Sequence, residues 1–266
     1  MSFQPQESRI VYGSVLALAM VFASGCNKQP LPTAESQTVT VGESSASNQA
    51  ARELRIAVIQ DKTLSTGTTR TPQLALKELE PIIQAMSIKG GELAVGVIHD
   101  RSNLSFARLR IDAMPIEPVV PPKAENPLER RKQRAAMATQ TEEFKAQRQA
   151  WENETEVRIG TFRTAVEPML SMRPEAKHSP VWDAVRRADL FLSETESRNG
   201  ATPDRYCFLI TDGIDDVGAL PVPVNSGARV LLVNGSGEMG SLGVLKPAFF
   251  ESITAAFRQI LTNESR

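Results

Sequence analysis

The most regular feature of the chain is a series of short apolar runs, several of them rich in β-branched residues. Runs of this length that are apolar at nearly every position are typical of strands buried on both faces of a parallel sheet. We expect such strands at residues 54–60, 92–99, 206–210 and 228–233. Residues 106–111 instead alternate apolar with polar side chains, which predicts an edge strand with one face in water.

Between these runs, apolar residues recur at the three- to four-residue spacing of amphipathic helices. The spacing predicts helices at residues 72–86, 182–193 and 247–261. Strands that alternate with helices predict an α/β fold, in which a mostly parallel sheet is flanked by helices on both faces.

A proline-rich connector and a long helical segment interrupt this alternation at residues 113–172. Proline fixes φ and disfavours helix at the residue before it, so the first part of this insertion is predicted to be extended. The second part, residues 128–172, predicts one long, coiled-coil-like helix or two helices with a break near Gly160. Unbroken, it would be about 60 Å long, with its later, apolar part docked on the sheet. Its earlier, polar part would either project as a stalk or fold back as a hairpin.

The polar part of this helix carries a cluster of basic residues at positions 130–134. Nearby acids nearly balance the cluster, which favours a solvated helix face, and a surface for an acidic partner or lipid headgroups is the alternative. The whole chain has a net charge of −1, which gives no electrostatic case for binding nucleic acid.

The first 26 residues have the pattern of a processing segment. Arg9 precedes an apolar run at residues 10–22, which is too short to span a bilayer and is typical of a signal peptide. The run leads into Ala-Ser-Gly and then Cys26, which resembles the bacterial lipobox. That resemblance implies removal of residues 1–25, lipidation of Cys26, and a lipid anchor in the bacterial cell envelope, on the periplasmic or outer-membrane face. The alternative is a simple cleaved signal peptide with an incidental cysteine.

Residues 26–52 are rich in Ser, Thr, Gln, Glu and Ala, and we expect them to form a flexible tether that reaches about 25–30 Å. The whole chain is 41% hydrophobic and 23% charged, as is usual for globular proteins. We therefore expect one folded domain at residues 53–262, interrupted by the insertion. The two cysteines, Cys26 and Cys207, and the isolated histidines provide neither a disulfide framework nor the spacing of a zinc site.

Oxygen-bearing side chains gather where two of the predicted strands end. Asp61, Thr63 and Ser65 follow the first strand at alternate positions, and Asp212 follows the strand at residues 206–210. Ligands bind at the carboxyl edge of open α/β sheets, and hard cations such as Mg²⁺ prefer oxygen donors of this kind. Taken alone, the first three residues would serve equally well as a turn and a helix N-cap.

A third group, Ser179-Pro180, precedes the helix predicted at residues 182–193, where the serine is well placed as an N-cap. In combination, the three groups resemble the metal site of the von Willebrand factor A (vWA) family. That site uses Asp-x-Ser-x-Ser after the first strand, a Thr in a later loop, and an Asp after the fourth strand. Here Asp-Lys-Thr-Leu-Ser starts at Asp61 with a threonine in place of the first serine. Ser179, in Ser-Pro-Val-Trp-Asp-Ala-Val, matches the threonine of Thr-Pro-Leu-Tyr-Asp-Ala-Leu, and Asp212, in Ile-Thr-Asp-Gly, matches the last ligand.

The resemblance covers about residues 54–112 and 175–262, and it implies a vWA-like, Rossmann-type domain that holds Mg²⁺ or Mn²⁺. An open position on the ion would accept an Asp or Glu from a protein partner, so the expected function is protein–protein interaction or assembly at the envelope. Lys62 lies in the first loop, and its cation would weaken metal binding unless it points away. The residues implied to bind the metal are Asp61, Thr63, Ser65, Ser179 and Asp212.

Two other functions remain open at this point. A metal-free domain would act as a scaffold through the helical insertion. The Asp-Lys-Thr at Asp61 also resembles the aspartyl-phosphate motif of haloacid-dehalogenase-type phosphatases, in which Asp61 would be the nucleophile and Mg²⁺ would offset the phosphate charge. However, Leu64 stands where that motif has glycine, and the sequence contains neither a P-loop nor a G-x-S-x-G elbow. We therefore expect a protein that is not an enzyme.

Overall fold

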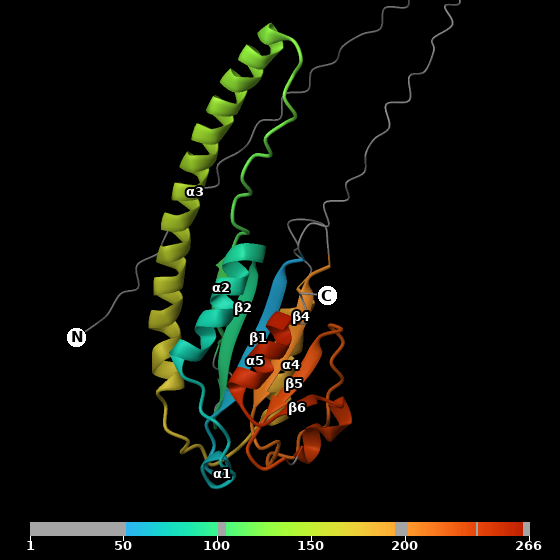
Figure 1. Cartoon of the computed structure of the whole chain (residues 1–266). Helices are drawn as coiled ribbons and strands as arrows, with labels where there is room; N and C mark the ends of the chain where they lie inside the picture. The colour runs from blue at the N-terminus through green and yellow to red at the C-terminus, as the bar shows by residue number, and fades with distance from the viewer. Residues whose placement is uncertain (1–51, 101–104, 195–201, 238, 263–266) are drawn as a thin grey trace, which may run out of the picture. The chain divides into compact units, whose positions relative to one another are not determined.

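The computed structural model describes residues 52–100, 105–194, 202–237 and 239–262 (Figure 1). The predicted signal peptide, Cys26 and the predicted tether up to residue 51 lie outside the described residues. Among the helices that are described, none is both long enough and apolar enough to span a membrane.

The described residues form a six-stranded sheet with the strand order β3-β2-β1-β4-β5-β6. Neighbouring strands are parallel, except that β3 runs antiparallel to β2. The mostly parallel α/β sheet expected from the sequence is therefore confirmed, and so is the edge position of the alternating strand. The strands are β1 (Leu54–Asp61), β2 (Gly91–Ile98), β3 (Ala107–Ile111), β4 (Asp204–Ile210), β5 (Arg229–Val233) and β6 (Ala248–Phe250).

Strand β1 lies at the centre of the sheet, and all eight of its residues are buried. It pairs with β2 on one side and with β4 on the other, which is the point where the strand order of a doubly wound sheet reverses. The register places Asp61 opposite Ile98 of β2 and Gln60 opposite Ile210 of β4. Side chains that directly follow Ile210 therefore emerge beside Asp61.

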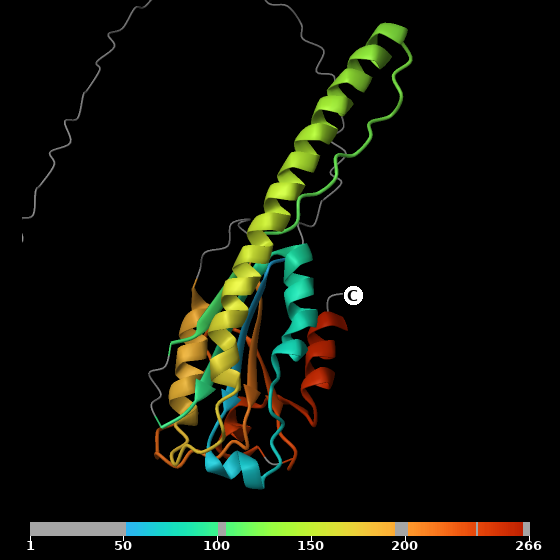
Figure 2. The ribbon, with the colours of Figure 1, turned by 90° about the vertical axis from the view of Figure 1, so that its left-hand side faces the viewer.

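Helices cover both faces of the sheet (Figure 2). Alternate β1 side chains explain the two layers, because Ile56 and Val58 pack in one apolar cluster with α2, α3 and α5, whereas Ala57 and Ile59 pack in another with α4. The α-helices are α1 (Leu64–Thr68), α2 (Glu80–Lys89), α3 (Pro127–Leu170), α4 (Val181–Ser193) and α5 (Ile253–Thr262). Two 3₁₀ helices, η1 (Leu76–Leu79) and η2 (Gly240–Leu245), complete the helical segments that are described.

The helix predicted at residues 72–86 is wrong at its start, over residues 72–75. The Gln60 side chain accepts a hydrogen bond from the Leu74 amide (2.7 Å) and donates one to the Pro72 carbonyl (3.4 Å). These bonds tie residues 72–74 to the end of β1, so the chain turns helical only at η1 and α2.

The helix predicted at residues 247–261 is also wrong at its start, because β6 occupies residues 248–250. Phe249 packs in the α4 cluster and Phe250 in the opposite one, as expected for a strand whose successive side chains alternate between faces. A strand of three residues is too short to show this period in the sequence, so its apolar residues resemble the start of the helix that follows.

Helix α3 is one continuous helix of 44 residues, so there is no break near Gly160. At 1.5 Å per residue it is about 66 Å long. Its later part packs on the sheet through Phe162 and Val166. The Trp151 indole donates a hydrogen bond to the Asp112 carbonyl (2.8 Å), directly after the end of β3. Residues 127–150 therefore project beyond the sheet as a stalk (Figure 1).

We expect Phe162→Ala to lower the free energy of unfolding by about 3–5 kcal/mol, because it removes a ring that is 2% exposed and leaves a cavity between α3 and the sheet. The matched control is Val157→Ala in the same helix, where the side chain is 69% exposed and the change should stay within about 0.5 kcal/mol. Urea denaturation followed by circular dichroism measures both. Equal, small effects would contradict the packing of α3 on the sheet.

Candidate functional site

The candidate site is built around the carboxylate of Asp61 at the carboxyl end of β1. Asp61 is fully buried, and both of its oxygens accept hydrogen bonds. Oδ1 accepts from the Thr63 amide (2.9 Å) and the Thr63 hydroxyl (2.7 Å). Oδ2 accepts from the hydroxyls of Thr211 (2.6 Å) and Ser179 (3.3 Å). Three segments that are distant in sequence thus meet at one carboxyl group.

The remaining predicted residues lie next to this carboxyl group. The Ser65 hydroxyl is 3.1 Å from the Thr63 hydroxyl. Asp212 accepts a hydrogen bond from the Ile214 amide (3.0 Å), and its negative charge acts on Asp61 through space. The structure therefore brings together all of the residues that the sequence pointed to.

Burial raises the pKa of Asp61 above its ordinary value, and the neighbouring charge of Asp212 raises it further. The hydrogen bonds from Thr211 and Thr63 act in the opposite direction, because they stabilise the ionised form. The negative charge of Asp212 therefore acts on a carboxylate that is already removed from water, and a bound cation would offset that repulsion.

The prediction that Ser179 is the N-cap of the following helix is wrong. Helix α4 has Pro180 at its N-cap and no side-chain cap bond from that residue. The Ser179 hydroxyl points to Asp61 instead, while its amide donates to Asp216 (2.6 Å). Asp215 accepts from the Trp182 amide (3.1 Å) and so satisfies the first turn of the helix. These two acids, which follow Asp212 in the loop, hold the start of α4 and thereby fix Ser179 against the site.

Two hydroxyls belong to the cluster although the sequence analysis missed them. Thr211 is fully buried and makes the shortest hydrogen bond to Asp61 given above. The Thr69 hydroxyl lies 3.5 Å from an oxygen of Asp212 and 3.0 Å from the Ser65 carbonyl. The sequence could have predicted Thr211 as a site residue, since it stands directly between a buried strand and Asp212. The sequence gives no such indication for Thr69. It follows a helix of only five residues, which is too short to be recognised from its pattern.

Lys62 lies within the site loop but points away from the carboxylates. Its ammonium group donates to the Gln73 side chain (2.7 Å) and to the carbonyl of Leu170 (2.7 Å), the last residue of α3. Burial lowers the pKa of this lysine. The backbone of the loop also bonds to the segment after α3, because Leu64 donates to the Ala176 carbonyl (2.9 Å) and Ala176 donates to the Lys62 carbonyl (3.1 Å). Residues on both sides of Thr63 are therefore anchored to α3 or to the segment that follows it.

The oxygen atoms of the cluster fit a hard cation that binds with few charged ligands. They belong to two carboxylates and several hydroxyls, and Mg²⁺ and Mn²⁺ prefer oxygen ligands of this kind. In the part of the chain that is described, no group of three or more His, Cys, Asp or Glu side chains could hold a metal. A cation at this cluster would be held by hydroxyls as well as by carboxylate charge.

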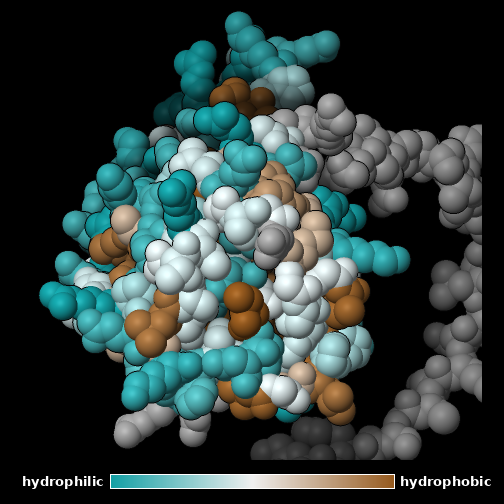
Figure 3. Space-filling model, turned by 90° about the horizontal axis from the view of Figure 1, so that it is seen from below, coloured by the Kyte–Doolittle hydropathy of each residue, from teal (hydrophilic) through white to brown (hydrophobic). Residues whose placement is uncertain are grey.

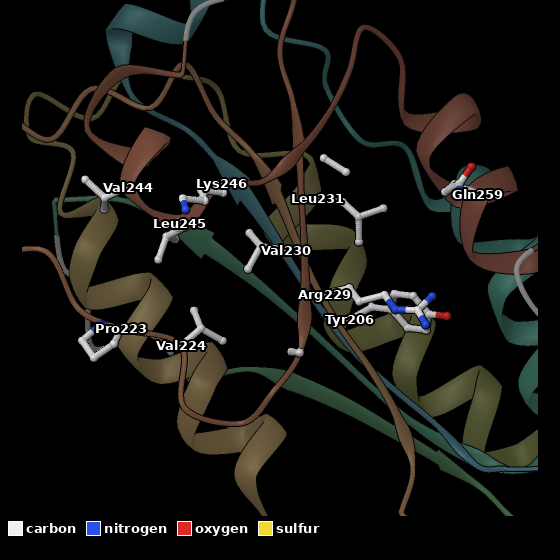
Figure 4. Close-up of a pocket in the computed structure, with 12 residues that line it drawn as sticks. Tyr206, Pro223, Val224, Arg229, Val230, Leu231, Val244, Leu245, Lys246 and Gln259 are labelled. Atoms are coloured by element: carbon white, nitrogen blue, oxygen red, sulfur yellow. The ribbon is translucent and has the colours of Figure 1, made fainter.

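The site lies at the end of the molecule that faces the viewer in Figure 3, where apolar patches are separated by polar side chains. Leu64 at the start of α1 is 53% exposed, and Ile214 beside Asp212 is 47% exposed. A separate hollow of about 630 Å³ lies along β5, between Tyr206 and Lys246 (Figure 4). None of the predicted site residues lines that hollow, so the candidate site lies outside it.

We expect Thr211→Val to raise the pKa of Asp61 further and to destabilise the fold by about 1–3 kcal/mol at neutral pH, because a buried carboxylate loses a donor. A raised folded-state pKa means that stability is greatest below the unfolded pKa and declines as the pH rises through the folded pKa. The variant should extend this decline to higher pH, as urea denaturation from pH 4 to pH 8 would measure. Thr68→Val is the control, since that hydroxyl is exposed. Equal losses in both variants would contradict this arrangement.

We expect Lys62→Met to remove the dependence of folding stability on pH in the alkaline range. The folded-state pKa of Lys62 is lowered, so the unfolded chain binds more protons and stability rises with pH from the lowered pKa up to the ordinary value of 10.5. Methionine preserves the shape but not the charge, and the rise should disappear. Denaturation curves from pH 7 to pH 10 test this, with exposed Lys77→Met as the control. A rise that survives in the Lys62 variant would assign it to another group.

No protein-family model, no curated protein and no solved structure matches this chain. The case for a function therefore rests on the geometry around Asp61 and Asp212.

Proposed function

We propose that this protein is an envelope-anchored lipoprotein whose vWA-like domain binds a protein partner through a divalent cation, Mg²⁺ or Mn²⁺. The observation that carries the proposal is the cluster in which Thr63, Ser65 and Ser179 surround Asp61 beside Asp212. The cluster lies between β1 and β4, where the strand order reverses and where ligands bind in open α/β sheets.

The chain's own residues divide the work of such a site. Asp61 supplies negative charge from behind the hydroxyls of Thr63 and Ser179, which donate hydrogen bonds to it, and Asp212 supplies a second carboxylate. The hydroxyls of Thr63, Ser65 and Ser179 supply neutral oxygens. When bound, the ion would offer a carboxylate of the partner an open coordination position. Lys62 does not compete with the ion, because its ammonium group is engaged by Gln73 and the end of α3.

The burial of Asp61 supports binding in preference to nucleophilic catalysis. A nucleophilic carboxylate must present an oxygen to the phosphorus atom of its substrate. Both oxygens of Asp61 are instead occupied by donors from the protein, and the side chain has no exposed surface. The proposed function is therefore non-enzymatic.

The surroundings of the site suit a protein partner. Leu64 and Ile214 are both about half exposed and lie in the two loops that carry the site residues. A partner that docks there would bury these apolar side chains and would also interact with the charged centre. A partner carboxylate that reached the ion beside Asp212 would bring the partner over these two side chains.

Isothermal titration of the folded chain with Mg²⁺ and Mn²⁺ tests the proposal. We expect saturable binding at one site, with affinity lowered at least about tenfold by Ser65→Ala and further by Asp212→Asn. Because burial raises the pKa of Asp61, the affinity should increase with pH and binding should release protons. Glu117→Gln in the exposed connector is the control variant and should bind like the unaltered chain.

A thermal-shift series with the same variants separates loss of metal from loss of fold, because ligand binding raises the melting temperature only where a site exists. A folded chain that binds neither ion would contradict the proposal. It would leave the metal-free scaffold, whose partner would then be sought along α3.

A further inference from the structure

The projecting end of the insertion, made up of the end of the connector and the start of α3, differs in charge from the rest of the helix. Residues 119–138, which we call the stalk tip, have a net charge of +3, whereas residues 139–170 have a net charge of −2. Positive charge is therefore concentrated at the end of the helix that is furthest from the sheet. The basic residues of the stalk tip are Lys123, Arg130, Arg131, Lys132 and Arg134.

The stalk tip also exposes apolar side chains next to these charges. Val119 is 86% exposed, Val120 is 77% exposed, and Leu128 at the start of the helix is 60% exposed. A groove of about 530 Å³ runs between the connector and the helix, and Val120 and Met137 contribute to its walls together with three of the basic residues. An apolar groove bordered by cations matches the chemistry of a phospholipid, which joins an anionic headgroup to acyl chains.

The connector is fixed to the helix at this point. The Gln133 side chain donates to the Pro122 carbonyl (2.8 Å) and accepts from the Ala124 amide (3.3 Å). Asn126 caps the helix by accepting from the Leu128 amide (2.9 Å). These bonds hold the valines of the connector beside the basic residues of the helix, so the stalk tip presents both as one surface.

The position of the stalk tip in the fold indicates which surface it can meet. The stalk projects from the end of the sheet where β1 begins, and the candidate site lies at the opposite end (Figure 1). The projecting residues 127–150 span about 36 Å. The segment between Cys26 and β1 is expected to reach about 25–30 Å, which is nearly the same distance. A membrane that holds Cys26 is therefore within reach of the stalk tip.

We propose that the stalk tip docks on an anionic phospholipid surface, namely that of the membrane that anchors the chain; this inference rests on the proposed lipid anchor. The basic side chains contact headgroup phosphates, and the exposed valines enter the boundary between headgroups and acyl chains. In this arrangement the domain stands off the membrane, and the candidate site faces away from it, towards a partner.

An acidic protein would also complement the charge of the stalk tip. Val119 and Val120, which are exposed beside the charges, would suit either occupant. The lipid surface is favoured because the expected tether and the stalk have similar lengths, which a protein interface would not require.

Vesicle flotation of the chain from residue 27 onward tests the inference without any acyl group. Every buried apolar side chain in the described residues lies between Leu54 and Ile260, so this version retains that core. The vesicles contain phosphatidylethanolamine and phosphatidylglycerol, or phosphatidylcholine alone. We expect binding only to the anionic vesicles, weakened by salt.

The variants change the stalk tip and a matched position on the same helix. Arg130→Glu/Arg134→Glu should reduce binding to the anionic vesicles at least about tenfold, since each basic residue near such a surface contributes about fivefold. Lys145→Glu/Arg148→Glu makes the same change in charge nearer the sheet and should reduce binding much less. Val119→Ser/Val120→Ser should also weaken binding, because it removes the apolar side chains without a change in charge.

Several results would overturn the inference. These are equal binding to both kinds of vesicle, equal losses in the two charge variants, and no vesicle binding at all. Retention of the chain on immobilised polyglutamate without vesicle binding would assign the stalk tip to an acidic protein instead. The metal titration is independent of the stalk tip. Failed vesicle binding beside successful metal binding would therefore remove this inference alone, and the reverse result would remove only the metal site.

Discussion

The arrangement of this protein depends on one constraint: the buried carboxylate of Asp61 must receive hydrogen bonds. A carboxylate without partners is costly away from water, so its burial requires donors in fixed positions. Those donors come from the loop after β1, from the end of β4 and from the segment before α4. The central strand pairing sets the first two at the same level, and the acids Asp215 and Asp216 hold the third.

A second buried charge connects this site to the long helix. The ammonium group of Lys62 meets the carbonyl of Leu170 at the end of α3, where the helix dipole leaves partial negative charge. The residue next to Lys62 is Thr63, which bonds to Asp61. The loop that carries the site and the helix that forms the stalk are therefore in direct contact, and the position of one restricts the position of the other.

The two ends of the domain differ in chemistry. The carboxyl end of the sheet gathers acids and hydroxyls, while the distal part of α3 gathers basic and exposed apolar side chains. Under our two proposals the first end recognises a protein partner and the second meets the membrane. A rigid helix that extends about 36 Å beyond the sheet would separate the two events in space.

The sequence alone determined the core strands and the polar residues that follow them, because burial on both faces requires nearly continuous apolar runs. It mispredicted residues 72–75 and the start of the last helix, because contacts that are distant in sequence determine the structure there. Residues 72–75 are held by the Gln60 side chain, and the start of the last helix is replaced by a strand that pairs with β5. Only the tertiary structure showed that α3 is unbroken, that Thr211 serves Asp61, and that Lys62 turns away. The direction of a side chain depends on which partner the neighbouring element offers, and spacing along the chain does not encode that.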